Sequence, residues 1–385
     1  MRLNERVLHI LAIAAATLIP PILVWAPFFI RMPSFWGIKL PQEGMATIIA
    51  NFDGPYYIVA AKTLYNTAAL GQFEFPLPKE YYAAHFPAFP LLIRAFSPLF
   101  GYPWAMMIVT LLSSFVALML FYLLIRQVGL KTHALWLTLV FAVFPARWLI
   151  VRSVGSPEPL FIAAVLASFY FLLRGNYWAT GIAGAVAMFT KSPGILLFAA
   201  LTAALAAPHI HNLFIQPTST LRKLLPQGLP LLFIPATVLL VFAWYARAYG
   251  DFFAYFHSGD NIHLLFPPFQ VFNAAQTWVG TFWLEEINWL YLFGFLGVFA
   301  LIKKRQFPFA WFVGTFFAST LFVSHRDIAR YILPIVPFLF IAFSDVLTSR
   351  PFRWALALLL LPIYLSALNF IIGNVTPIAD WRPLL

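Results

Sequence analysis

The chain has no cysteine and few charged residues. The absence of cysteine among its 385 residues excludes disulfides, thiolate metal sites and cysteine nucleophiles. Charged residues make up 10% of the chain, and hydrophobic residues make up 62%. A soluble domain cannot bury so much apolar surface, whereas a lipid bilayer solvates it when the backbone is helical. The composition therefore predicts an all-α, polytopic integral membrane protein.

Long apolar runs recur along the whole chain. A helix needs about 20 residues to cross the bilayer, so these runs predict about eleven spans, in a single transmembrane domain over residues 1–385. We interpret the first run as a retained anchor, because it is long and lacks a small-residue cleavage site. The predicted spans lie near residues 7–30, 103–125, 133–151, 159–173, 176–190, 193–210, 229–249, 287–302, 307–323, 328–347 and 354–372.

Charge predicts the orientation of these spans. Alternate short loops are rich in lysine and arginine, and the positive-inside rule assigns them to the cytoplasmic side. Every acidic residue except Glu5 and Asp345 then lies on the outer side. We therefore expect the active site on the outer face, which carries the long loops 31–102 and 251–286, and we favour a prokaryotic plasma membrane. The net charge of +11 fits membrane lipids and phosphate ligands and requires no nucleic-acid partner.

The first outer loop holds the most informative polar residues. Asp53 and His85 lie there among aromatic residues and prolines. Apolar residues spaced three or four apart over 53–70 predict an amphipathic helix in the membrane interface. A second short apolar segment at 86–100 is expected to be interfacial as well.

Five short motifs follow one another along the chain. They are Phe52-Asp53, the run from His85 to Leu92, the run from Ser156 to Phe161, the run from Thr190 to Gly194, and the run from Asp327 to Pro334. Their order resembles that of the GT-C glycosyltransferases, which take a sugar from a polyprenyl phosphate. Within this superfamily the chain is most similar to the GPI mannosyltransferase II (PIG-V-like) group, although Phe52 and Lys191 stand where that group has Trp and Arg.

The resemblance implies an inverting membrane glycosyltransferase, most simply a mannosyltransferase. It would move a hexose from a polyprenyl-phosphate sugar to a lipid-linked or surface glycan acceptor. Such a reaction needs a carboxylate that orients or deprotonates the acceptor hydroxyl. Asp53 is the expected base, with a helix N-cap as its alternative role. Glu158 is the expected second carboxylate, with a solvated loop acid or a charge at a helix start as the alternatives.

The reaction also needs groups that hold the donor. The expected substrate-binding residues are His85, Lys191, Arg326, Arg330 and Tyr331. The alternatives are an interfacial histidine held by loop carbonyls for His85 and a side chain that snorkels to the membrane interface for Lys191. A guanidinium group matches phosphate well, although pairing of Arg330 with Asp327 is an alternative. Arg147 and Arg152 are weaker candidates for phosphate binding.

We expect no metal, and no cofactor other than the lipid-linked sugar donor as co-substrate. Asp53, Glu158, Asp260 and His263 could surround a divalent ion, but their spacing does not require one. Two other classes compete with a glycosyltransferase: a transporter or flippase of lipid-linked sugars, and a non-catalytic assembly subunit of an envelope complex. A transporter would more often show repeats and charges inside its spans.

Overall fold

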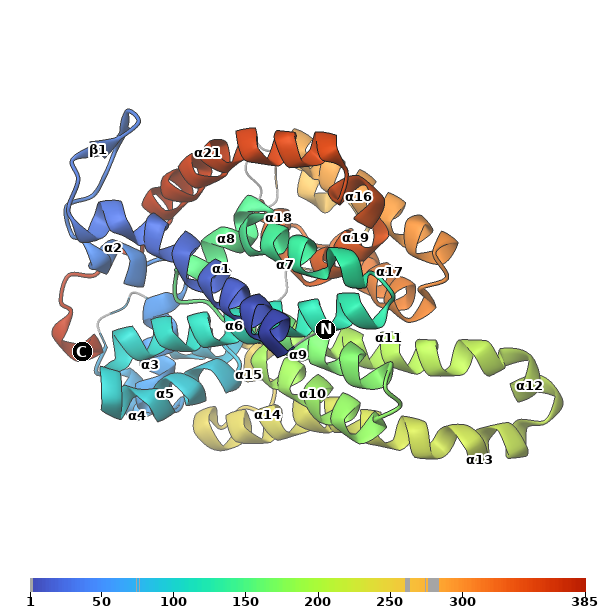
Figure 1. The fold of residues 1–385 in the computed structure, drawn as a ribbon. Helices are drawn as coiled ribbons and strands as arrows, with labels where there is room; N and C mark the ends of the chain where they lie inside the picture. Colours follow the sequence, from blue (N-terminus) through green and yellow to red (C-terminus); the bar gives the residue numbers. More distant parts are fainter. Residues whose placement is uncertain (1–2, 74, 76, 260–263, 274, 276–283) are drawn as a thin grey trace. The chain divides into compact units, whose positions relative to one another are not determined.

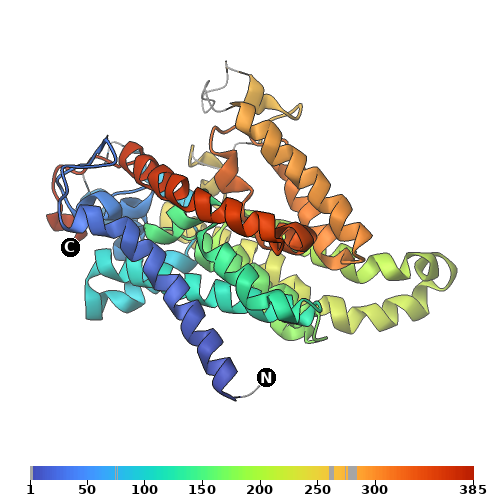
Figure 2. The same cartoon turned by 45° about the horizontal axis from the view of Figure 1, so that its top comes forward.

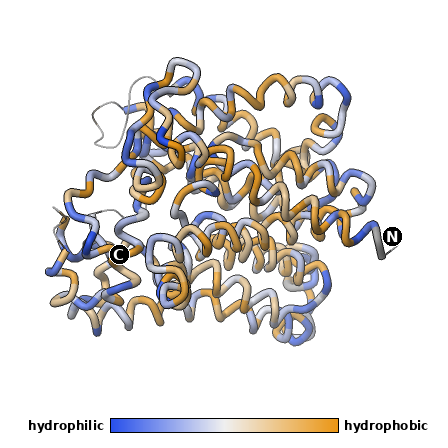
Figure 3. Tube along the Cα trace, turned by 60° about the vertical axis from the view of Figure 1, so that its left-hand side comes forward, coloured by the Kyte–Doolittle hydropathy of each residue, from blue (hydrophilic) through white to orange (hydrophobic). Residues whose placement is uncertain are grey.

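A computed structural model describes residues 3–73, 75, 77–259, 264–273, 275 and 284–385. Within these ranges nearly all regular structure is helical (Figure 1). The one sheet described is a hairpin of β1 (Ser34–Phe35) and β2 (Ile38–Lys39), with Ser34 opposite Lys39. Hydrophobic residues run along the helices, and hydrophilic residues gather at many of the helix ends (Figure 3). The predicted all-α class is confirmed.

The chain forms two compact units. The first comprises residues 1–163, 241–259 and 345–385, and the second comprises 164–240 and 260–344. Helices α9 (Glu158–Leu172), α14 (Phe233–Tyr249) and α20 (Ser344–Leu347) run across the boundaries. The single domain over 1–385 stays a prediction.

The first unit contains the long first loop. Its α3 packs on α5, and α1, α6, α7 and α8 pack on one another (Figure 2). Its elements are α1 (Leu3–Phe29), β1, β2, α2 (Met45–Ile49), α3 (Gly54–Thr63), α4 (Thr67–Leu70), η1 (Lys79–Ala84), α5 (Ala88–Phe100), α6 (Tyr102–Gln127), η2 (Lys131–His133), α7 (Ala134–Val143), α8 (Ala146–Ser153), α15 (Ala254–His257), α21 (Arg350–Gly373) and η8 (Arg382–Leu384).

In the second unit, α11 packs on α17, and α16 packs on both α17 and α19. Its elements are α10 (Tyr177–Thr190), η3 (Ser192–Gly194), α11 (Ile195–Ala206), η4 (Ala207–His209), α12 (Ile210–Ile215), α13 (Pro217–Gly228), η5 (Leu229–Leu232), η6 (Gln270–Phe272), α16 (Leu284–Lys303), α17 (Phe307–Thr320), α18 (Ile328–Tyr331), η7 (Leu333–Ile335) and α19 (Val336–Ala342).

Helices lie at all the predicted span positions, but not all are long enough to cross a bilayer. In the described part of the chain, six helices have the length and composition of a span. A seventh arises if α7 and α8, bent by 70°, count as one span. The protein is thus an integral membrane protein, while the count of about eleven is not confirmed.

The segment 53–70 differs from its predicted form. Instead of one amphipathic helix it contains α3 and α4, because Leu64 takes a left-handed conformation that ends α3. Most residues of α3 are buried, on all sides of the helix. The prediction of a one-faced interfacial helix is therefore wrong for α3. The second predicted segment is the helix α5, which leaves Leu99 and Phe100 exposed.

A buried arginine stabilises irregular backbone in the first unit. Proline has no N–H, so Pro20 and Pro21 inside α1 leave the carbonyls of Ala16 and Thr17 without their helical partners. The Arg152 Nη2 donates to these two carbonyls at 3.1 and 2.9 Å, and its Nη1 donates to the carbonyl of Ala142, where α7 is about to end.

The side chain of Arg152 is 0% exposed. Its assignment to phosphate binding is therefore wrong, because the whole side chain is buried and both of its terminal nitrogens donate to the protein's own backbone. Another side chain replaces a missing helical hydrogen bond further along α1. Because Pro27 has no N–H, the Leu23 carbonyl lacks its helical partner, and the Tyr364 hydroxyl donates to it at 2.9 Å.

We expect Arg152→Met to lower the free energy of unfolding by about 3 kcal/mol or more, because each buried carbonyl left unpaired costs about 1–3 kcal/mol. Unfolding in detergent, followed by circular dichroism, measures this loss. The exposed Arg174→Met serves as control and should change little. In a Pro20→Ala, Pro21→Ala background, two backbone N–H groups can donate to the carbonyls of Ala16 and Thr17. The stability lost through Arg152→Met should therefore be smaller in that background. An equal loss in both backgrounds would refute the proposed coupling.

Candidate active site

Asp53 lies in the turn between α2 and α3. It occupies the N-cap position of α3, yet its side chain accepts no hydrogen bond from the amides of that helix, all of whose residues are described. An aspartate whose role is capping would accept such a bond. The capping alternative is therefore wrong.

The backbone on both sides of Asp53 is tightly constrained. Phe52 has a left-handed conformation with φ of 51°, which costs a non-glycine residue about 1–2 kcal/mol. At Gly54, a Cβ atom would lie 2.6 Å from the carbonyl oxygen of Ile49. Only glycine fits there, so the main chain approaches α2 closely and fixes the direction in which Asp53 leaves the turn.

The turns that carry Asp53 and Glu158 meet at one side chain. A Cβ atom on Gly54 would lie 3.2 Å from the Cε of Met106, and a Cβ atom on Gly155 would overlap the Met106 thioether. Met106 is a fully buried residue of α6. Two glycines thus let both turns pack against the same methionine within the first unit.

Glu158 is buried, with 3% of its surface exposed. The Ser156 hydroxyl donates to its Oε2, and the Ser156 amide donates to Thr110 Oγ1 of α6 at 3.2 Å. The alternative of a solvated loop acid is therefore wrong, whereas the alternative of a charge at a helix start fits, because Glu158 is the first residue of α9. A buried carboxylate is costly without polar partners. The Ser156 hydroxyl is such a partner for Glu158, and Thr110 holds Ser156 in place.

His85 lies against the first turn of α3. Its ring centroid is 4.7 Å from that of Tyr57 and 5.4 Å from that of Tyr81. The side chain is 2% exposed, and its Nδ1 has no hydrogen-bond partner among the described residues. An unpaired polar atom in such a position is expensive unless a ligand satisfies it.

A tyrosine holds the backbone of His85. The Tyr65 hydroxyl donates to the His85 carbonyl oxygen at 2.6 Å, and both residues are buried. Burial raises the pKa of Tyr65 well above its usual value, so the hydroxyl keeps its proton and remains a donor. Sequence reasoning missed Tyr65, because no local pattern connects it to a residue 20 positions away.

The remaining predicted residues belong to the second unit. Lys191 ends α10, where Gly194 allows a turn too tight for a side chain, since a Cβ atom would lie 2.5 Å from the Cα of Met188. Arg326 is exposed, and Arg330 and Tyr331 are half-buried in α18.

The loop before α18 is well anchored. The Asp327 carboxylate accepts a hydrogen bond from the backbone amide of Arg330 at 3.3 Å, and the Asp327 amide donates to His325 Nδ1 at 2.9 Å. The Tyr331 ring lies 5.3 Å from that of His325. Asp327 thus caps the helix that carries Arg330, Arg326 lies just before this cap, and Tyr331 follows Arg330 at its end.

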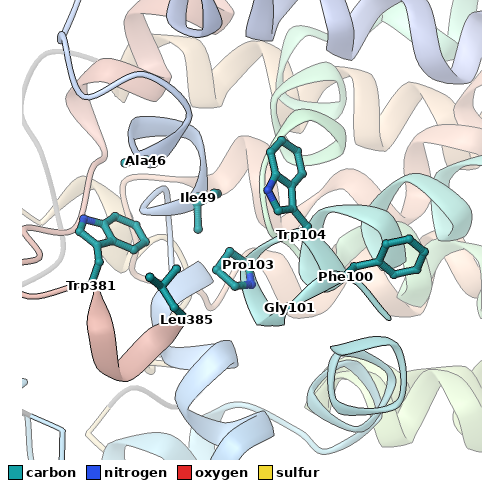
Figure 4. Close-up of a pocket in the computed structure, with 8 residues that line it drawn as sticks. All are labelled: Ala46, Ile49, Phe100, Gly101, Pro103, Trp104, Trp381 and Leu385. Carbon is teal, nitrogen blue, oxygen red and sulfur yellow. The ribbon is translucent and has the colours of Figure 1, made fainter. Parts of the chain in front are cut away.

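An apolar pocket of about 300 Å³ lies beside α2 and the start of α6 (Figure 4). Figure 4 shows Trp104 and Trp381 on opposite sides of it, with Ile49 and Pro103 between them. None of the predicted site residues lines it, so this pocket is separate from the candidate active site.

No three histidine or acidic side chains of the described residues gather closely enough to hold a metal ion. Two of the residues considered for such a site, Asp260 and His263, lie outside the described ranges. The absence of a metal requirement stays a prediction.

The chain shares its fold with two solved proteins. The crystal structure of ArnT from Cupriavidus metallidurans bound to undecaprenyl phosphate is similar with a TM-score of 0.56 at 13% identity, over 95% of this chain and 64% of that one. The archaeal oligosaccharyltransferase AglB from Archaeoglobus fulgidus, in complex with an inhibitory peptide and a dolichol-phosphate, is similar with a TM-score of 0.52 at 14% identity, over 99% of this chain and 57% of that one.

The chain therefore spans less than two thirds of the length of either protein. No family model matches the sequence, and no curated protein matches it. The polytopic, all-α membrane fold is shared with these two structures, whereas the GT-C resemblance and the narrower similarity to GPI mannosyltransferase II stay predictions.

We expect Tyr65→Phe to lower the free energy of unfolding by about 1–3 kcal/mol, because it leaves the buried His85 carbonyl unpaired. Tyr249→Phe is the matched control, since the Tyr249 hydroxyl has no hydrogen-bond partner among the described residues. Thermal unfolding in detergent compares the two variants. Equal stability of both variants would contradict the role assigned to Tyr65.

Proposed function

We propose that the protein is a membrane glycosyltransferase that uses a polyprenyl-phosphate sugar as donor. The observation that carries this proposal is the meeting of the Asp53 and Glu158 turns at Met106. The shared fold supports it, since one of the two similar structures holds undecaprenyl phosphate and the other a dolichol-phosphate. The motif resemblance makes mannose the first donor sugar to test, with a lipid-linked or surface glycan as acceptor.

In the proposed reaction, an acceptor hydroxyl oxygen attacks the anomeric carbon of the sugar. A new glycosidic C–O bond forms as the bond to phosphate breaks on the opposite face, which inverts the configuration. The hydroxyl proton goes to Asp53, and the electron pair of the broken bond leaves with the phosphate. A positioned base of this kind contributes about 10²–10⁴-fold to the rate.

The other residues have binding roles in this proposal. Glu158 orients sugar or acceptor hydroxyls, because a carboxylate accepts such hydrogen bonds well. The buried His85 Nδ1, for which the described part of the chain offers no hydrogen-bond partner, is a hydrogen-bonding site for the sugar or the phosphate. Lys191, Arg326, Arg330 and Tyr331 are assigned to the phosphate by their motifs and chemistry. The site would act at the outer face of a prokaryotic plasma membrane.

Asp53→Asn tests the assigned base. We expect kcat to fall by about 10²-fold or more, because an amide cannot take the proton, while the unfolding temperature stays close to that of the wild type. The measurement is transfer of radiolabelled mannose from the polyprenyl-phosphate donor by purified protein in vesicles.

Asp251→Asn is the matched control. Asp251 is an acid of the second long outer loop, and its hydrogen bond with His257 lowers its pKa. The control should leave transfer unchanged. An Asp53→Asn enzyme as active as the control would remove Asp53 from the mechanism.

Arg330→Gln tests donor binding. Loss of a charge-assisted contact to phosphate should raise the donor KM by about tenfold or more, with a smaller change in kcat. Arg350→Gln, at the start of α21, is the control for the loss of one positive charge. Initial rates over a range of donor concentrations separate the two parameters. An unchanged donor KM in Arg330→Gln would contradict the assignment.

A further inference from the structure

The segment that follows α21 returns to the turn that carries Asp53. The amide of Phe52 donates to the carbonyl of Asn374 at 3.2 Å, and the amide of Thr376 donates to the carbonyl of Ala50 at 2.8 Å. Asn51 and Val375 form an antiparallel bridge between these bonds. Residues 374–376, hereafter the tail clamp, thus pair with 50–52 across more than 300 positions of sequence.

The hydroxyl of Thr376 completes the pairing. It donates to the carbonyl oxygen of Phe52 at 3.0 Å. Both backbone polar groups of Phe52 are therefore held by the tail clamp, and Phe52 directly precedes Asp53. These bonds also hold the left-handed conformation of Phe52, which a non-glycine residue keeps only when its surroundings impose it.

The end of α21 holds the same turn from a second direction. Asn51 is 0% exposed, and its Nδ2 donates to the Ile371 carbonyl at 2.6 Å. The Phe52 ring lies 5.3 Å from that of Phe370. These contacts add to the tail clamp and leave the turn little freedom to move.

A third contact secures the chain beyond the tail clamp. The Lys62 ammonium group, near the end of α3, donates to the carbonyl of Pro383 at 2.6 Å. The tail also supplies Trp381 to the pocket beside α2 (Figure 4). The helix that begins after Asp53 and the helix that ends before it are therefore both in contact with the tail.

We propose that the tail clamp is a positioning element for Asp53 and that the Thr376 hydroxyl is its decisive group. This inference rests on the proposed function. Asp53 has to meet the acceptor hydroxyl within hydrogen-bond reach, and a displacement of about 1 Å at a reacting group can cost about 10²-fold in rate. Fixing the carbonyl and the amide of the preceding residue limits such displacement.

Thr376→Val and Thr376→Ser form the test pair, because valine keeps the shape but loses the hydroxyl and serine keeps the hydroxyl. We expect Thr376→Val to lower kcat by about tenfold with the donor KM unchanged, and Thr376→Ser to stay within about twofold of the wild type. Rates are expressed per folded, monodisperse protein. A merely structural role would lower the yield or the unfolding temperature without this split between kcat and KM.

Thr138→Val is the matched control, since the buried Thr138 hydroxyl donates to the Ala134 carbonyl inside α7 at 2.7 Å. It should keep the wild-type kcat. Hydrogen–deuterium exchange adds a readout independent of catalysis, and residues 50–57 should exchange faster in Thr376→Val but not in Thr138→Val.

Three results would overturn the inference and leave the proposed function intact. They are an unchanged kcat in Thr376→Val, a loss of kcat in Thr376→Ser equal to that in Thr376→Val, and an unchanged hydrogen–deuterium exchange rate over residues 50–57 in Thr376→Val. Absence of transfer by the wild type with every donor tested would instead overturn the proposed function, and the inference with it. The two failures are therefore distinguishable.

Discussion

Backbone polar groups in an apolar environment must find partners inside the protein, and this constraint organises the first unit. Prolines in α1 free three carbonyl oxygens, and distant side chains satisfy them. Arg152 of α8 takes two, and Tyr364 of α21 takes the third. The same arginine donates to Ala142 near the end of α7. Irregular helices thus become the points at which α1, α7, α8 and α21 are joined.

The same constraint shapes the candidate active site. In the turn before Asp53, the Ala50 carbonyl and both backbone polar groups of Phe52 pair with residues 374–376. The Glu158 turn is tied to α6 through Ser156 and Thr110. Rigid surroundings of this kind suit a reaction that depends on the position of a carboxylate more than on its exposure. The contacts that stabilise the Asp53 and Glu158 turns are therefore also the ones that would position the two carboxylates for the proposed reaction.

The sequence predicts the local features well and the distant contacts poorly. Apolar runs locate the helices, because hydrophobicity alone decides which segments a bilayer accepts. The motifs predict Asp53, His85 and Glu158 as site residues, and their roles stay predictions. The spacing of apolar residues predicts the wrong structure at 53–70. Most residues of α3 are buried in the protein on all sides, so the helix has no separate polar and apolar faces. The groups that pair with the carbonyls of Ala16 and Thr17 and with the backbone of Phe52 lie far away in sequence, and no local pattern predicts them.

The most direct test of the central claim follows the fate of the donor. Purified protein in vesicles receives polyprenyl-phosphate mannose labelled in the sugar, together with a membrane glycolipid extract as acceptor, and mass spectrometry follows both products. The account predicts free polyprenyl phosphate together with a labelled, sugar-extended acceptor. Intact donor that has only crossed to the other leaflet would contradict it and indicate a flippase. Intact donor on its original side, with mannose, glucose and arabinose donors alike, would contradict it as well and favour an assembly subunit.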